Sequence, residues 1–465
     1  MKTAILAGWI GGVMAVQAAD VSGWRNDGNG LYPNARASLD WSKSLWQSDL
    51  PAPSNACPIL VDGKLIFTAE PATLMAADAG SGELLWQSGN EYIDLLEGGK
   101  EEAEAAKKKM EEVKLLLEPL EKELYRAQRL ARRNKDDKEA NRKLREARAK
   151  VKVVKASLGE AAEFSPPPAH KTNGYSSYTP VSDGKRVWAC FGNGVVVSYD
   201  LKGKRLWHKR LSAPDHNWGG ACSPVLAGGV LVVRFSDYVG LDPATGEELW
   251  RTPSEGVTFN APAQFERGGQ HFLITSRGEL IEAGDGKKLK SSGFTVKAKP
   301  WCFLNTPSVI GNHVYFAHGS EGEQGDAYCL EIPANAADVQ SQGLKQVWHQ
   351  QVSKNRYYSS PLVHDGIVYL ISREYVLQAL DAASGEVFYE QKIKGLTGTA
   401  YPSLTLVGDT IFVGAEDGRA AFVKPGESYQ EMARTETDPY RSTPIFVDDR
   451  TYLRTQETLR AISVK

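Results

Sequence analysis

The sequence predicts an all-β fold, an eight-bladed β-propeller of four-stranded antiparallel blades. Two observations predict it: a unit headed by proline recurs along the chain, and in most units an aspartate–glycine turn precedes an aromatic residue. The composition agrees, because 465 residues with 42% hydrophobic residues, 44 Gly and 23 Pro are too apolar for disorder and too interrupted for a helical bundle. A net charge of −2 argues against a chain built as a whole to bind nucleic acid.

The front half of each unit predicts a β-hairpin. A small or polar residue and a proline precede two apolar alternations joined by a Gly or Asp turn, as in NTPSVIGNHVYFA. Apart from the first pair, successive prolines are 38 to 54 residues apart, near the length of a four-stranded blade. An insertion of roughly 80 residues explains the longer first separation. The marker prolines are Pro58, Pro180, Pro224, Pro262, Pro307, Pro361, Pro402 and Pro444.

The back half of the unit predicts a second hairpin, as in VGLDPATGEELWR. The aspartate accepts hydrogen bonds from the turn backbone, and the glycine supplies a positive φ. An aromatic residue near the end of the last strand is expected to fill the gap between blades, with sugar stacking as the alternative. These residues are Trp86, Trp207, Trp250, Trp348 and Tyr389. The last unit has only three strands, and residues 39–47 are expected to supply the fourth and close the ring.

The N-terminus predicts export. Lys2, an apolar run and small residues before Asp20 are typical of a cleavable signal peptide over 1–19, with an uncleaved anchor as the alternative. No cysteine stands at the cleavage point to take a lipid anchor. We therefore expect a periplasmic or secreted protein without a transmembrane segment after cleavage. Its expected parts are an N-terminal segment with closing strand and first blade (20–93), an inserted hairpin (94–164) and blades two to eight (165–465).

The cysteines indicate no structural framework. Cys57, Cys190, Cys222, Cys302 and Cys329 are odd in number, so at least one is free or pairs with another chain. Because none stand in a C-x-x-C pair, neither a zinc site nor a disulfide scaffold is indicated.

The insertion predicts an antiparallel helical hairpin. Small or apolar residues recur at heptad spacing from Ala103 to Ala131 and again from Ala140 to Ala161. Two helices of about 25 to 30 residues should pair into a coiled coil ~40 Å long. Pro119 is expected to kink the first helix.

The tip of this hairpin is basic. A basic tip fits lipid head groups, an anionic polysaccharide or an acidic protein, and the alternative is a solvated surface. Nucleic acid is not expected, since the basic residues have no aromatic interleaving. The candidate partner-binding residues are Arg129, Arg132, Arg133, Lys135 and Lys138.

The loops that run into the marker prolines are expected to meet at one rim of the propeller. They bring aromatic and polar residues together, which is typical of a binding surface, although rings that only pack between blades are the alternative. The candidate ligand-binding residues are Tyr178, Asp215, His216, Asn217, Trp218, Asn260, Trp301, Asn305, Tyr357, Tyr401, Tyr440 and Arg441.

Three stretches resemble a known family. GLDPATGEELW (240–250) is similar to the tryptophan-docking motif of pyrroloquinoline quinone (PQQ) dehydrogenases and PQQ-like-repeat propellers, including the BamB-like outer-membrane assembly proteins. Residues 173–233 and the segment GWRNDGNGLYPNA resemble exported members. The resemblance implies the propeller fold and leaves the function open.

The favoured function is a non-catalytic scaffold that binds envelope or secreted proteins or anionic polymers, acts as a monomer and needs no cofactor. One alternative is a PQQ- and calcium-dependent alcohol or sugar dehydrogenase. Against it, the family's calcium ligands and adjacent cysteines are not found, and no CxxCH haem motif is present. The other alternative is a carbohydrate-binding or carbohydrate-cleaving propeller, whose carboxylate pair the sequence does not reveal.

Overall fold

The computed structural model describes residues 20–26, 28–96, 100–133, 135–167, 169–214, 218–254, 259–289 and 303–464. The predicted signal peptide, 1–19, therefore lies outside the described residues. No helix in the described part of the chain is long and apolar enough to cross a membrane.

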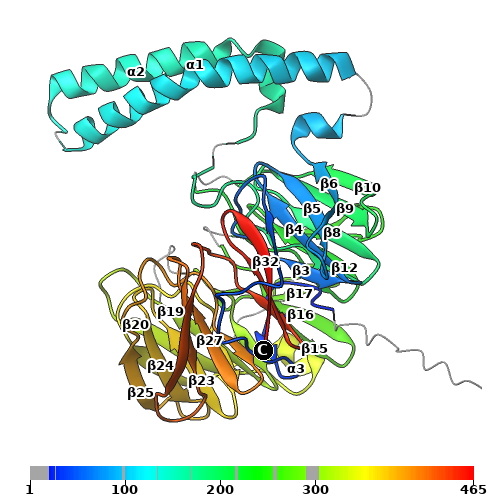
Figure 1. The fold of residues 1–465 in the computed structure, drawn as a ribbon, viewed down its shortest axis with the longest axis vertical. Helices are drawn as coiled ribbons and strands as arrows, with labels where there is room; N and C mark the ends of the chain where they lie inside the picture. The colour runs from blue at the N-terminus through cyan, green and yellow to red at the C-terminus, as the bar shows by residue number, and fades with distance from the viewer. Residues whose placement is uncertain are drawn as a thin grey trace, which may run out of the picture.

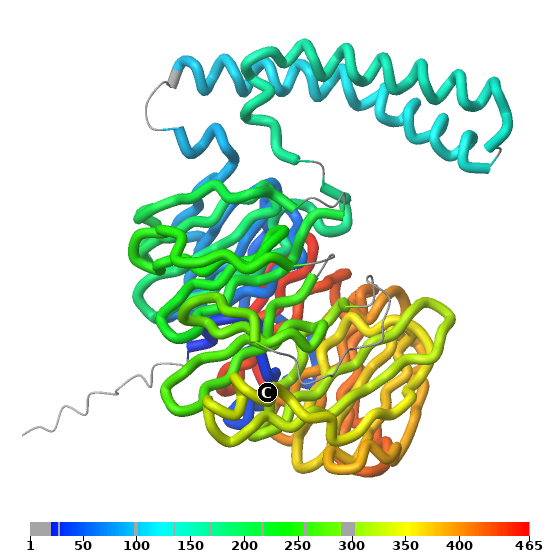
Figure 2. Tube along the Cα trace, turned by 180° about the vertical axis from the view of Figure 1, so that it is seen from behind, coloured from blue at the N-terminus to red at the C-terminus, as the bar shows by residue number. Residues whose placement is uncertain are grey.

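The described residues form eight sheets, numbered here 1 to 8 in chain order (Figures 1 and 2). Sheet 1 contains β3 (Ile59–Val61), β4 (Lys64–Ala69), β5 (Thr73–Asp78) and β6 (Leu84–Gly89). Sheet 2 contains β7 (Val181–Ser182), β8 (Arg186–Cys190), β9 (Val195–Asp200) and β10 (Arg205–Arg210). Sheet 3 contains β11 (Val225–Ala227), β12 (Val230–Arg234), β13 (Tyr238–Leu241) and β14 (Glu248–Thr252). Sheet 4 contains β15 (Ala263–Arg267), β16 (Gln270–Ile274) and β17 (Leu280–Glu282), and residues 290–302 after it lie outside the described part.

The second half repeats this plan. Sheet 5 contains β18 (Ser308–Ile310), β19 (His313–His318), β20 (Gly325–Glu331) and β21 (Lys345–Val352), with the short helix α3 (Ala336–Gln342) before β21. Sheet 6 contains β22 (Leu362–His364), β23 (Ile367–Ile371), β24 (Val376–Asp381) and β25 (Val387–Lys392). Sheet 7 contains β26 (Thr405–Val407), β27 (Thr410–Gly414), β28 (Arg419–Val423) and β29 (Glu431–Glu436). Sheet 8 contains β30 (Ile445–Val447), β31 (Arg450–Arg454) and β32 (Thr458–Ser463).

The N-terminal segment joins the last two sheets. β2 (Trp46–Asp49) pairs antiparallel with β32, so the sheet partner predicted for this segment is confirmed, although the strand begins later than the predicted 39–47. β1 (Leu31–Tyr32) pairs parallel with β26 of sheet 7. Between them Trp41 packs against Phe412 and Tyr440, with only 2% of its surface exposed. The described N-terminal strand β2 and the C-terminal strands therefore share sheet 8.

Tryptophans join neighbouring sheets, which confirms the packing role predicted for them. Each indole N–H donates to a backbone carbonyl in the turn of the following sheet: Trp86 to Leu201, Trp207 to Pro243, Trp250 to Ala283 and Trp348 to Ala382. The turn glycine has a second role, because a Cβ on Gly385 would lie 2.8 Å from the Trp348 ring. Glycine thus allows both the positive φ of 79° and the close approach of the indole.

Two helices lie between β6 and β7 in the chain and pack side by side (Figure 1). They differ in length from the prediction: α1 (Lys100–Arg133) has 34 residues and α2 (Lys138–Ala156) has 19. α1 also continues through Pro119, which lies on its exposed face, where water can bind the carbonyl that loses its hydrogen bond. The chain leaves α2 through Gly159, whose φ is +56°, and enters the short helix η2 (Gly159–Phe164).

Several of the predicted small and apolar positions are buried. Ala106, Val113 and Ala127 of α1 are buried, as are Ala147 and Val151 of α2. The pair attaches to the sheets through η1 (Tyr92–Leu95), where Ile93 packs with Ala106 and Ala161. Lys107 also forms an ion pair with Asp94 at 3.0 Å.

Candidate functional site

A ring of small side chains holds the inner strands together. The residue two positions before the first strand of each sheet belongs to this ring, which we call the belt: Cys57, Thr179, Ser223, Ala261, Thr306, Ser360, Ser403 and Thr443. In most of the ring, the backbone N–H of one belt residue donates to the side chain of the next, as from Thr306 to Ser360 at 3.0 Å and from Ser360 to Ser403 at 3.1 Å. Thr443 N–H donates to Cys57 Sγ at 3.2 Å, which links the last sheet to the first.

A second ring lies two residues earlier in the same segments. Its members, which we call the mouth ring, are Asn55, Ser177, Ala221, Phe259, Leu304, Tyr358, Tyr401 and Arg441. Every residue of both rings lines one central cavity of about 780 Å³. Because side chains alternate along extended backbone, the residues two and four positions before each first strand point into the cavity. Of the residues between them, Asn260 and Asn305 also line the cavity, whereas Tyr178 is buried between the sheets.

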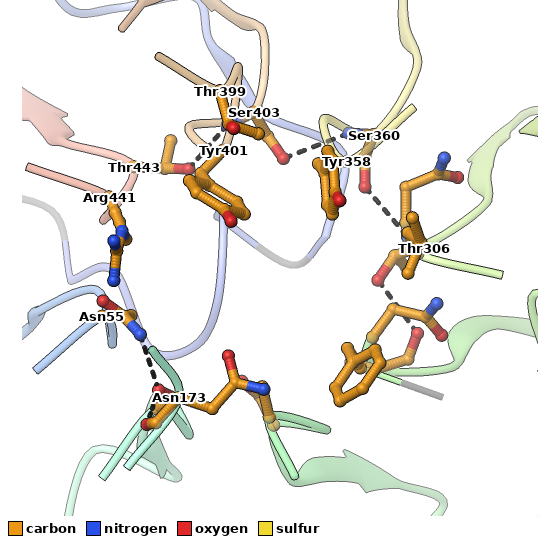
Figure 3. Close-up of a pocket in the computed structure, with 18 of the residues that line it drawn as sticks. Asn55, Asn173, Thr306, Tyr358, Ser360, Thr399, Tyr401, Ser403, Arg441 and Thr443 are labelled. Carbon is orange, nitrogen blue, oxygen red and sulfur yellow. Dashed lines mark hydrogen bonds between the residues drawn. The ribbon is translucent and has the colours of Figure 1, made fainter. Parts of the chain in front are cut away.

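The mouth ring has an apolar side and a polar side. Ala221, Phe259, Leu304, Tyr358 and Tyr401 follow one another in sheets 3 to 7, and Arg441, Asn55 and Ser177 follow in sheets 8, 1 and 2. Tyr358 and Tyr401 meet edge to face at 5.0 Å (Figure 3). An amphipathic cavity of this kind is suited to binding.

Arg441 is fixed in place by a tight ion pair. Its Nε and Nη2 atoms donate to Glu416 Oε1 at 2.8 and 2.7 Å, and its Nη1 atom donates to the Thr172 carbonyl at 3.2 Å. The guanidinium lies over the Tyr401 ring, 5.3 Å from its centre. Arg441 therefore links Glu416, the Thr172 carbonyl and the Tyr401 ring in the cavity wall.

Two further arginines of the cavity wall share one carboxylate. Arg356 Nη2 and Arg373 Nη1 contact the two carboxylate oxygens of Glu321 at 3.5 and 3.4 Å, and the Glu321 side chain is 64% exposed. Arg356 also donates from Nη1 to the Tyr358 hydroxyl at 3.3 Å. Glu321 is the one carboxylate among the described residues that line the cavity.

The segment after the helix pair forms a lip of the cavity, residues 169–178. Glu70 holds it: the carboxylate accepts from the backbone N–H groups of Tyr175 and Ser176 and from the Ser176 hydroxyl. Burial raises the pKa of Glu70, and these hydrogen bonds offset part of that rise. Near the start of the lip, the His170 ring stacks on the Trp218 ring, with 3.9 Å between the ring centres.

The N-terminal segment forms the floor. Trp24 lines the central cavity and also a second cavity of about 330 Å³. Arg25, 1% exposed, donates through Nη2 to the carbonyls of Pro361 and Leu404, each at 2.8 Å. The floor is thereby tied to the entries of sheets 6 and 7.

The predicted ligand-binding residues divide into three groups. Trp218, Asn260, Asn305, Tyr401 and Arg441 line the cavity. Tyr178, Tyr357 and Tyr440 do not: each is fully buried between the sheets, which corrects their assignment to the rim. Asp215, His216, Asn217 and Trp301 lie outside the described residues.

The residues that sequence reasoning missed have a simple signal in all but one unit. Counting three residues back from a marker proline gives the mouth-ring residue, for example Tyr358 before Pro361 and Leu304 before Pro307. In the other units the marker proline directly precedes the first strand of the sheet. The seventh unit departs from this rule, because Leu404 precedes β26 and Pro402 lies two residues before Leu404. Glu321 and Arg373 come from other loops, after β19 and β23, and carried no such signal.

The described lining of the cavity does not fit a calcium ion. Calcium binds six to eight oxygen atoms, usually with several carboxylates. The described lining provides one carboxylate, Glu321, which already contacts two arginines, and the described residues contain no cluster of three His, Cys, Asp or Glu side chains suited to a metal.

The predicted hairpin-tip residues Arg129, Arg132, Arg133, Lys135 and Lys138 are all exposed at the loop between α1 and α2. The ion pairs that join the two helices, Lys150 with Glu123 and Lys155 with Glu121, lie away from the tip.

Comparison with known proteins agrees with this architecture. The chain is 26% identical over 245 residues to outer membrane protein assembly factor BamB of Yersinia pestis, covering 47% of this chain and 57% of the relative. It is 22% identical over 266 residues to BamB of Bordetella pertussis, covering 52% and 60%. The chain thus spans less than two thirds of the length of these relatives.

Two solved structures have the same fold. The crystal structure of BamB from Moraxella catarrhalis superposes with a TM-score of 0.55 at 12% identity, covering 91% of this chain and 98% of that one. Quinohemoprotein alcohol dehydrogenase from Comamonas testosteroni superposes with a TM-score of 0.56 at 10% identity, covering 97% and 81%. At these identities the superpositions show the fold alone.

The family model described as outer membrane protein assembly factor BamB matches residues 192–328 and 280–464. Because these matches span more than half of the chain, the protein belongs to this family of PQQ-like-repeat β-propellers.

Proposed function

We propose that the protein is an exported, non-catalytic scaffold that holds protein partners in the cell envelope at the mouth of a closed, eight-bladed propeller. The observation that carries this proposal is the contrast between the two rings. The belt consists of small side chains, most of which accept hydrogen bonds from the backbone N–H of a neighbouring belt residue, whereas the mouth ring brings five apolar or aromatic residues to one wall. The names of its relatives, which are assembly factors, favour the same role.

In this proposal residues 1–19 are a signal peptide, 20–93 contain the closing strand and first blade, 94–164 are an inserted hairpin, and 165–465 are the other blades. The protein acts as a periplasmic or secreted monomer. N-terminal sequencing of the exported protein is expected to begin near Asp20, and a mature chain that still carries residues 1–19 would contradict this part.

The hairpin is a second binding surface for acidic proteins or anionic envelope polymers. Arg129, Arg132, Arg133, Lys135 and Lys138 gather at its exposed loop, far along α1 from the ion pair of Lys107 with Asp94. The basic tip attracts a negatively charged partner over a range of about 8–10 Å at physiological salt.

Photo-crosslinking in cells tests both surfaces. A photoreactive residue at Leu304, in the mouth ring, is expected to capture an envelope protein, and so is one at Arg129. A residue at Leu249, which is 52% exposed on the outer strand β14, is the matched control. Capture only from Leu249 would contradict the proposal.

A titration with PQQ, with and without Ca²⁺, tests the non-catalytic assignment. We expect no change in melting temperature. A saturable, Ca²⁺-dependent stabilisation would contradict the assignment, because a ligand that binds the native state must stabilise it.

A further inference from the structure

We propose that the mouth binds an extended acidic and aromatic peptide segment of a partner, with Arg356 and Arg373 taking its carboxylate in place of Glu321. This inference rests on the proposed scaffold function and names the chemistry that its mouth selects.

Glu321 is positioned as a replaceable anion. Its two contacts with arginine are 3.4 and 3.5 Å long, whereas Glu416 holds Arg441 in the same mouth at 2.7 and 2.8 Å. Charge-assisted hydrogen bonds of full strength measure about 2.7–2.9 Å. Glu321 is also 64% exposed, against 25% for Glu416, so an incoming carboxylate can reach the same arginines from the solvent side.

The two arginines stand on a rigid support. Arg373 N–H donates to the Arg356 carbonyl at 2.7 Å, which ties the two loops together. Asn355, before Arg356, has a φ of +97°, and its side chain accepts from Arg356 N–H at 2.9 Å. A non-glycine residue in this region stores strain that the surrounding contacts must hold, and such positions concentrate at binding sites. The guanidinium groups are therefore presented by backbone that is already in place.

The apolar wall begins beside these arginines. Arg356 donates to the Tyr358 hydroxyl. Tyr358 in turn meets Tyr401 edge to face (Figure 3). Leu304 and Phe259 continue the wall in the preceding sheets. A ligand that places a carboxylate on the arginines thus places neighbouring aromatic or aliphatic side chains against this wall.

Charge and hydrogen bonding favour a peptide over an acidic sugar chain. Three arginines occur among the described lining residues, against the two carboxylates Glu321 and Glu416 that pair with them, so the remaining positive charge complements an anion. Ser360, Ser403, Thr443 and Cys57 already accept hydrogen bonds from the belt backbone. The wall of sheets 3 to 7 then offers apolar contact more than the dense hydrogen bonding that a sugar chain requires.

The test is a fluorescence-anisotropy titration of the full-length mature protein. The probe is a labelled eight-residue peptide of alternating phenylalanine and aspartate with blocked ends. Two control peptides replace either every aspartate by asparagine or every phenylalanine by serine, and tetragalacturonate serves as a competitor. We expect saturable binding of the probe and at least about tenfold weaker binding of each control peptide.

Three variants locate the site. Glu321→Gln is expected to bind the probe about threefold to tenfold more tightly, because it removes the competing carboxylate. The double variant Arg356→Gln, Arg373→Gln is expected to bind about tenfold more weakly. Arg251→Gln removes an arginine that pairs with Glu248 on the outer strand β14 and is the matched control, with unchanged binding expected. Melting curves of each variant verify folding.

Unchanged or weaker binding by Glu321→Gln would overturn the inference, as would equal binding of the asparagine peptide. If tetragalacturonate binds and the peptide probe does not, the inference is also overturned, in favour of a sugar ligand. If crosslinks from Leu304 persist while the peptide fails to bind, this inference fails and the scaffold proposal stands. If both fail, the scaffold proposal fails with it.

Discussion

The belt and the mouth ring lie two residues apart on the same eight segments, yet their chemistry differs. The belt contains only Cys, Ser, Thr and Ala, whereas the mouth ring contains Asn, Ser, Ala, Phe, Leu, Tyr and Arg. The belt is nearly uniform because most members accept a hydrogen bond from the same group, the backbone N–H of a neighbour. The mouth-ring side chains face the cavity, and no repeated backbone N–H donor among the described residues requires them to be small acceptors. Repetition thus marks the contacts that hold the sheets together, and variation marks the surface that is available for binding.

The largest expected effect comes from another repeated contact, the tryptophan that joins two sheets. Trp348 is 7% exposed, and its indole N–H donates to the Ala382 carbonyl at 2.9 Å. Trp348→Ala is expected to lower the free energy of unfolding by about 3–5 kcal/mol, as large aromatic truncations in cores do. Urea unfolding followed by circular dichroism measures it. A loss below 1 kcal/mol would mean that repeated contacts do not hold the sheets.

Substitutions at two turn glycines of sheet 6 distinguish the cost of a steric clash with an indole from the cost of backbone strain. Gly385 and Gly366 have similar φ values, 79° and 74°, but an added Cβ meets the Trp348 ring only at Gly385. Gly366→Ala is expected to cost about 1 kcal/mol from strain alone, and Gly385→Ala about 2–3 kcal/mol. In the Trp348→Ala background the two costs should become equal. A persistent difference in that background would show that the indole is not the cause.

The belt thiol is expected to be replaceable by a hydroxyl. Cys57 accepts from Thr443 N–H, and burial raises the pKa of the thiol, so it stays protonated at neutral pH. Cys57→Ser should keep the acceptor and leave stability nearly unchanged, whereas Cys57→Ala should cost about 1–2 kcal/mol. Thermal melts of the two variants under reducing conditions give the comparison. Equal losses would assign the effect to packing instead of to the belt hydrogen bond.

The smallest expected effect is the pH dependence of the lip. Burial raises the pKa of Glu70 above its ordinary value of 4.5, so the folded state binds a proton at higher pH than the unfolded chain. The contribution of Glu70 to stability should therefore rise as the pH falls from 7 toward 4.5. The difference in unfolding free energy between wild type and Glu70→Gln, measured at pH 7, 6 and 5, isolates it. A difference that does not vary with pH would show that Glu70 does not titrate in this way.

Sequence patterns predicted the sheets because the repeated contacts are local and identical. The aspartate–glycine turns and docking tryptophans follow from spacing within one unit. The pairing partner of the N-terminal strand follows instead from the missing fourth strand of the last unit. The lengths of the helices were less well predicted, since Gly159 ends the second helical pattern early and Pro119 lies on an exposed face that tolerates it.

The candidate site was predicted only in part because orientation depends on register. Tyr357 and Tyr358 are adjacent and chemically alike, yet the first is buried and the second lines the cavity. Tyr440 and Arg441 differ in the same way. One position along extended backbone reverses the direction of a side chain, and composition does not report that position. The pairing of Glu321 with Arg356 and Arg373 joins loops of two sheets, a contact that no local pattern encodes.

The most direct test of the contrast between the rings compares two opposite substitutions in one segment, serine to alanine in the belt and alanine to serine in the mouth ring. Ala221 belongs to the mouth ring, and Ser223 belongs to the belt and accepts from Thr179 N–H at 2.9 Å. Urea unfolding of Ser223→Ala is expected to show a loss of about 1–3 kcal/mol, because a buried N–H loses its acceptor, whereas Ala221→Ser should stay within about 0.5 kcal/mol of wild type. Equal effects, or a larger loss from Ala221→Ser, would contradict the division of the cavity wall into a belt that holds the sheets and a mouth that binds.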